Sequence, residues 1–133
     1  MGISIIVVGY WKHKEGGMPT AEVLELFGKP QDEGLQGVLA YDNQTYCEFS
    51  ITQENDTATV ISIDRPYAHQ SLYELLFELL ERGPYMLFSP EGEITPVVAR
   101  ADMIEHLPQS VIEAFGRPVI VPDGASLSST LFG

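Results

Sequence analysis

The chain has 133 residues, of which 44% are hydrophobic and 20% are charged. Nineteen Asp and Glu residues outnumber seven Lys and Arg residues, so the formal net charge at pH 7 is −12. This balance argues against binding to nucleic acid or to an anionic membrane surface. Both present negatively charged phosphates, which repel an acidic protein. The length is that of one folded domain, which we expect to span residues 1–133.

Location and cofactor needs follow from what the sequence lacks. Residues 1–8 are apolar but carry no basic n-region and no small-residue cleavage site, so they do not resemble a signal peptide. No run of residues approaches the roughly 20 apolar positions of a membrane helix. Cys47 is the only cysteine, which rules out an internal disulfide and a Cys-rich zinc site. We expect a cytoplasmic protein without cofactor or metal.

The first half of the chain predicts strands around one short helix. The apolar, β-branched run at residues 3–11 favours a strand buried on both faces. A short helix follows, with Thr20 as its N-cap and Gly28 near its end. Three strands joined by short turns come next, at residues 37–41, 45–52 and 57–63.

The second half contains the clearest element, a helix over residues 72–82. Its leucines recur with the spacing of a buried stripe: Leu72, Leu75, Leu76, Leu79 and Leu80. Ser71 and Glu74 match a capping box at its start. A hairpin of residues 85–89 and 94–99, two short helical turns and a strand over residues 119–121 follow. Residues 123–133 indicate a C-terminal tail, either flexible or docked.

Runs of strands separated by single helices favour an α+β fold over a doubly wound parallel fold. We therefore expect a single α+β domain with a largely antiparallel sheet, one long amphipathic helix and two or three short helices. Within residues 45–52, Cys47, Phe49 and Ile51 alternate with polar positions, so one face of this sheet is expected to meet the core.

No catalytic motif is present: the sequence has no G-x-S-x-G elbow, Walker loop or G-x-G-x-x-G. The histidines lack metal-ligand spacing. We expect His13 in a surface loop, His69 at a solvated helix entry, and His106 at the end of a helical turn, where its protonated form would suit the helix dipole. Cys47 is expected to be a buried, inert thiol. Together these features favour a protein that is not an enzyme.

The acids are unevenly distributed, because ten of them and a single base, Lys29, lie between Glu15 and Asp64. Acids in or beside turns reach outward without disturbing a core, and Trp and Tyr are favoured interface anchors. We predict a protein partner with a basic surface, bound through Asp32, Glu33, Asp42, Glu54, Asp56 and Asp64 with an aromatic anchor from Trp11, Tyr41, Tyr46 or Tyr67. The alternative is that the acidity serves only solubility.

The segment from Ser71 to Val121 contains SLYELLFELLERG, MLFSPEG and EHLP, a succession of helix, hairpin and Leu-Pro helix. In this rhythm, and in its size and acidity, the chain resembles the small acidic immunity proteins that bacteria make against polymorphic or secreted toxins. The resemblance implies a stoichiometric inhibitor that covers or distorts a toxin's active site. A second class stays open, a small enzyme or small-molecule-binding protein whose pocket is built from dispersed residues.

Overall fold

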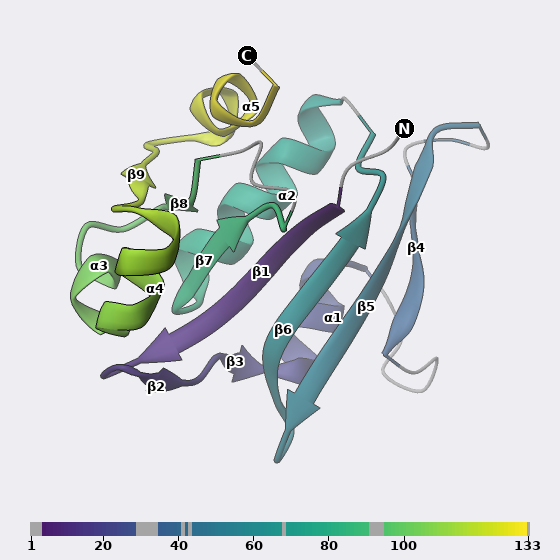
Figure 1. Cartoon of the computed structure of the whole chain (residues 1–133). Helices are drawn as coiled ribbons and strands as arrows, with labels where there is room; N and C mark the ends of the chain where they lie inside the picture. Colours follow the sequence, from purple (N-terminus) through teal and green to yellow (C-terminus); the bar gives the residue numbers. More distant parts are fainter. Residues whose placement is uncertain are drawn as a thin grey trace.

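A mixed β-sheet runs through the molecule, with helices on both of its faces (Figure 1). The computed structural model describes residues 4–28, 35–40, 42, 44–67, 69–90 and 95–132, without the side chains of residues 128, 131 and 132. The strands are β1 (Ser4–Trp11), β2 (Lys14–Glu15), β3 (Met18–Pro19), β4 (Gln36–Ala40), β5 (Tyr46–Glu54), β6 (Thr57–Asp64), β7 (Tyr85–Phe88), β8 (Val97–Val98) and β9 (Val119–Ile120).

The sheet order is β4-β5-β6-β1-β7-β8-β9, with β2 paired to β1 and β3 paired to β6. All of these pairs are antiparallel except β8–β9, which is parallel. The helices are α1 (Thr20–Leu26), α2 (Gln70–Arg82), α3 (Met103–His106), α4 (Gln109–Phe115) and α5 (Gly124–Phe132). The expected α+β class with a largely antiparallel sheet is confirmed.

The main core lies between one face of the sheet and helices α1 and α2. Side chains of the central strands, such as Ile5 and Ile61, are fully buried there against the leucine stripe of α2. Leu72, Leu76, Leu79 and Leu80 are all fully buried, as the periodicity predicted, whereas Leu75 is only partly buried. No helix in the described part of the chain is long and apolar enough to cross a membrane.

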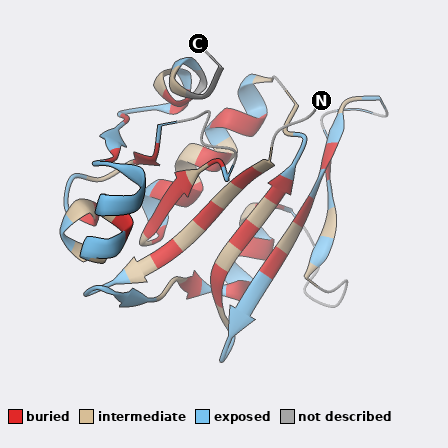
Figure 2. Cartoon of the chain, in the orientation of Figure 1, coloured by how far each residue is buried: buried red, intermediate tan, exposed pale blue. Residues whose placement is uncertain are grey.

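A smaller core covers only part of the opposite face of the sheet, chiefly over β7 and β8. Helices α3 and α4 pack there through Met103, Leu107 and Val111 against side chains of β7 and β8 (Figure 1). The buried and partly buried positions of β1 therefore alternate, and the expectation that residues 3–11 are buried on both faces is only half right. Over β4, β5 and β6 this second face carries no described helix, and Figure 2 shows exposed and intermediate positions interspersed with buried ones along these strands.

The first residues of helices α1 and α2 both differ from the sequence prediction. The N-cap of α1 is Pro19, and Thr20 is a buried first helical residue whose N–H donates to the carbonyl oxygen of Asp56 at 2.9 Å. The N-cap of α2 is His69, whose Nδ1 accepts a hydrogen bond from the N–H of Ser71 at 3.1 Å. The imidazole nitrogen of His69 therefore caps the helix in place of the Ser71 hydroxyl. The predicted capping box is wrong.

The C-terminal segment is a helix, α5, rather than an irregular tail. Asp123 Oδ1 accepts from the N–H of Ser126 at 2.7 Å and so begins the helix, while Leu127 is fully buried in the main core. The backbone of Gly124 lies against α2, because a Cβ added there would come within 3.2 Å of Glu74. The described part of this segment therefore packs on α2 and the main core.

Strands β1 and β6 separate at one end of the sheet. Their pairing runs from Ser4 to Val8, and beyond this point β3 takes the place beside β6. The close approach needs glycine: a Cβ on Gly9 would lie 2.0 Å from the carbonyl oxygen of Gly16, and one on Gly17 would lie 2.0 Å from that of Ala58. We call this place, bounded by Gly9, Gly17 and Ala58, the fork.

Candidate partner-binding surface

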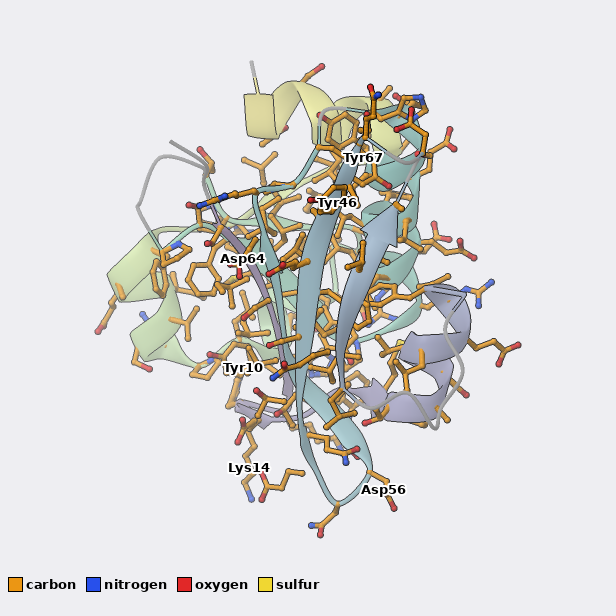
Figure 3. All side chains as sticks on the ribbon, turned by 90° about the vertical axis from the view of Figure 1, so that its right-hand side faces the viewer. Tyr10, Lys14, Tyr46, Asp56, Asp64 and Tyr67 are labelled. Carbon is orange, nitrogen blue, oxygen red and sulfur yellow. The ribbon has the colours of Figure 1, made fainter. Side chains whose placement is uncertain are left out.

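The structure divides the predicted partner-binding residues between the two ends of the sheet. Figure 3 shows Tyr46 and Tyr67 near one end and Asp56 at the other. Asp42, Tyr46, Asp64 and Tyr67 lie toward the first end, and Trp11, Glu54 and Asp56 lie at the second. A strand rises about 3.3 Å per residue, so the two ends of β5 are about 26 Å apart. Asp32, Glu33 and Tyr41 lie outside the described residues.

At the first end, a row of side chains crosses four strands on the uncovered face of the sheet. The registers place Val38 beside Glu48, Glu48 beside Asp64, and Asp64 beside Ser4. The Ser4 hydroxyl donates to Asp64 Oδ1 at 3.0 Å. Like charges directly opposite each other destabilise a sheet, and among the described residues neither carboxylate has an ion-pair partner. The pair therefore offers negative charge that the described chain leaves uncompensated.

Exposed apolar side chains flank this carboxylate pair. Val38 is 39% exposed and Tyr46 is 55% exposed, and Tyr46 lies two residues before Glu48 on the same strand face. A shallow hollow of about 480 Å³ is lined by residues that include Val38, Glu48, Ser50 and Asp64. We call the surface made by Val38, Tyr46, Glu48, Ser50 and Asp64 the open-face site.

The two other predicted residues at this end have structural roles. Asp42 Oδ1 accepts hydrogen bonds from the N–H groups of Gln44 (2.8 Å) and Thr45 (2.7 Å), and these bonds lower the pKa of Asp42. A lowered pKa is the opposite of what a general acid requires. Tyr67 is partly buried against the main core on the helix side, and this burial raises the pKa of its phenol.

Val38 and Glu48 line the open-face site but are not among the predicted partner-binding residues. The alternation of residues 45–52 predicts that Glu48 lies on the polar face of its strand, but its neighbour across the sheet is fixed by the β5–β6 register, which no local pattern reveals. The alternation in β5 was the only signal available. This alternation shows on which face of the sheet a side chain lies. It does not show which residues of other strands lie beside that side chain.

The three histidines make specific contacts. The His106 ring stacks on Trp11 with centroids 3.9 Å apart, and its Nδ1 accepts from the N–H of Lys12 at 3.1 Å. His106 is the last residue of α3, the helix-end position that the sequence predicts. His13 is in an exposed turn as predicted, and its Nε2 donates to the carbonyl oxygen of Glu105 at 2.8 Å.

Two further exposed apolar side chains, Val119 and Ile120, lie on β9 at the opposite edge of the sheet, and Phe115 of α4 is also exposed. Pro118 and Pro122 flank the edge strand β9. Because proline has no N–H to donate, these two positions limit the addition of a further strand there. This edge is therefore a weaker candidate for recognition than the open-face site.

Cys47 is 3% exposed, on the helix-facing side of β5, and burial raises the pKa of its thiol. The predicted buried thiol is confirmed. We expect a thiol reagent such as dithionitrobenzoate to label Cys47 slowly in the native protein near neutral pH and rapidly in urea, because the thiolate is the reacting form. Equal labelling rates in the two conditions would contradict this expectation.

Within the described ranges, no three His, Cys, Asp or Glu side chains gather in a way that could hold a metal ion. Comparisons of the chain with protein-family models, curated proteins and solved structures give no match. Inference about function therefore starts from the geometry of this chain.

Proposed function

We propose that the chain is a non-enzymatic protein-binding protein that holds a basic protein partner on the open-face site. The observation that carries this proposal is the exposed carboxylate pair of Glu48 and Asp64 in direct cross-strand register. A Lys or Arg side chain placed between the two carboxylates would replace their repulsion by two attractions. Arginine fits best, since its planar fork can bond both groups.

The neighbours of the carboxylate pair supply the apolar contact that a stable complex needs. Tyr46 projects from the same strand face, and tyrosine is among the residues that most often dominate binding energy. Val38 adds exposed apolar area from the edge strand β4. Protein interfaces combine apolar contacts with charged groups. The net charge of −12 steers a basic partner toward the open-face site.

The specific role that we propose is that of a bacterial immunity protein in the cytoplasm. Toxins that act on nucleic acid need a basic cleft, and an acidic sheet face is complementary to one. The uncovered face and the overall acidity support this role, and so does the resemblance in the segment from Ser71 to Val121. The first partner to test is the product of the adjacent gene, because an immunity gene normally lies beside its toxin gene.

The test compares the double variant Glu48→Gln/Asp64→Asn with the control Glu81→Gln/Glu113→Gln, which removes two exposed carboxylates elsewhere. Association rates with the candidate partner are measured at low and high salt. We expect the first variant to associate about tenfold more slowly at low salt and to lose most of the salt dependence. The control variant should keep most of both.

Stability provides the check against misfolding. Removing a repulsive pair should leave the free energy of unfolding of the Glu48→Gln/Asp64→Asn variant unchanged or raised, while binding falls. Equal slowing in the two double variants would mean that only overall charge matters and that the open-face site has no special role. Failure of the wild-type chain to bind the adjacent gene's product would contradict the immunity role.

A further inference from the structure

A second candidate site lies at the other end of the sheet, beside the fork. A cleft of about 740 Å³ opens there between the β1–β2 hairpin and the β5–β6 hairpin. Its size falls within the range of small-molecule sites. Figure 3 shows Lys14 and Asp56 at this end, away from Tyr46. The cleft therefore shares no lining residue with the open-face site.

Charges of both signs line the cleft. Lys12 and Lys14 come from the β1–β2 hairpin, and Glu54 comes from the end of β5; Glu15 adds a second acid. Across the described chain, ion pairs within 4.0 Å form at Arg82–Glu78 and Arg100–Asp102, and none joins these four residues. Two ammonium and two carboxylate groups thus border one cavity with no direct ion pair among them.

An aromatic wall completes the cleft. Trp11 lines it and is 46% exposed, so part of the indole faces solvent. Aromatic rings attract cations, and tryptophan does so most strongly. The cleft therefore offers the carboxylates of Glu15 and Glu54 to a positive group and the two lysines to a negative group, and Trp11, opposite Lys14 in the hairpin, forms an aromatic wall.

The basic side of the cleft is fixed in place at some expense of backbone strain. Lys12 and His13 have φ of 51° and 68°, a left-handed pair that hairpin turns usually give to Asn-Gly. Contacts with α3 hold them: His106 Nδ1 accepts from the N–H of Lys12, and the carbonyl oxygen of His106 accepts from the N–H of His13 at 2.9 Å. Such fixation reduces the ordering cost of binding a ligand.

From these features we infer that the cleft binds a small zwitterion of the amino-acid or betaine class. A simple anion would meet Glu15, Glu54 and the field of a chain with net charge −12. A simple cation would meet Lys12 and Lys14. A molecule that carries an ammonium and a carboxylate a few bonds apart offers a positive group to the two glutamates and a negative group to the two lysines. It has no net charge. This inference does not depend on the proposed protein partner.

The test uses glycine betaine as the probe and Trp11 as the reporter, because Trp11 is the only tryptophan of the chain. Betaine should change the Trp11 fluorescence in a saturable manner. An equimolar mixture of tetramethylammonium chloride and sodium acetate carries the same two groups unlinked, and it should bind more weakly because linkage raises the effective concentration of the second group. A response to the salt mixture equal to that with betaine, or no saturable response to betaine, would overturn the inference.

Two variants and a control locate the site. Lys14→Gln and Glu54→Gln should each weaken betaine binding about two- to fivefold, the size expected for partly exposed charge pairs. The control Glu81→Gln, on the exposed side of α2, should bind like the wild type. Unchanged affinity in both cleft variants would contradict the assignment, since the fold tolerates changes at exposed side chains.

His106 acts through Lys12 and Trp11, so it is a positioning residue. In His106→Asn an amide oxygen stands near the place of Nδ1 and can accept from the N–H of Lys12, whereas His106→Leu has no acceptor. Both variants lose the imidazole stack on Trp11. We expect betaine binding to be weakened more in the leucine variant than in the asparagine variant, and equal weakening would show that the hydrogen bond does not position the cleft.

Discussion

Replacing Leu76 by alanine is expected to lower the free energy of unfolding by about 2–5 kcal/mol. Leu76 is fully buried at the centre of the α2 stripe and belongs to the core that joins this helix to the sheet. The substitution removes apolar contacts and leaves a cavity that a tightly packed core closes only in part. The helix itself is not weakened, because alanine has the highest helix propensity.

The matched control is Leu75→Ala, the same chemical change on the adjacent residue of the same helix. Leu75 is only partly buried at the edge of the core, so its loss should cost clearly less than that of Leu76. Urea denaturation of the three proteins, fitted with a common slope, gives the comparison. Equal midpoints for the wild type and Leu76→Ala would mean that the stripe does not form the core.

Elements whose signal is local were predictable from the sequence. The leucine spacing of residues 72–82 gave α2 to within two residues, since the helix spans Gln70–Arg82. The alternation around Cys47 identified the buried face of β5 correctly. Both patterns arise from the geometry of a single element, so they can be read without knowing what the element contacts.

Features that depend on distant residues were not predictable. The adjacency of Glu48 and Asp64 depends on the β5–β6 register, and the two-residue strands β2 and β3 are defined by their pairing with β1 and β6. The parallel β8–β9 pair likewise joins segments separated by α3 and α4. Such short strands carry too few residues for a periodic signal.

Helix ends show an intermediate case, in which the right location was predicted with the wrong residue. The start of α2 lies beside Ser71 as expected, yet His69 provides the cap. The helix α5 was missed although Asp123 precedes it and Leu127 faces the core. Its serines and threonine weaken helix propensity, and packing against α2 outweighs that weakness.

Tyr85 is the largest fully buried side chain of the described core, and its hydroxyl joins three strands. The hydroxyl donates to the carbonyl oxygen of Ala58 at 2.7 Å and accepts from the N–H of Met18 at 3.0 Å. Burial raises the pKa of Tyr85 from 10.0 to about 12. Beside the fork, the hydroxyl therefore ties β7 to β3 as an acceptor and to β6 as a donor, and ionisation removes the bond to β6.

The wild-type protein is expected to lose stability as the pH rises from about 10 to about 12. Below the unfolded pKa of 10.0 both states hold the proton, so the full contribution of Tyr85 is present. Above it the unfolded state ionises first, and a difference of about two pKa units corresponds to about 2–3 kcal/mol. The loss is complete only once the pH has passed the folded pKa of about 12.

Tyr85→Phe isolates this effect, because every other titrating group is shared with the wild type. Near neutral pH the variant should be less stable by about 1–3 kcal/mol, since the carbonyl oxygen of Ala58 and the N–H of Met18 lose their partner. As the pH rises toward 12, the wild type falls toward the variant and the difference closes. Urea denaturation of both proteins at about pH 8 and about pH 11.5 measures the two differences within the range set by the two pKa values. A difference that is the same at both pH values would show that the Tyr85 phenol ionises equally readily in the folded and unfolded states.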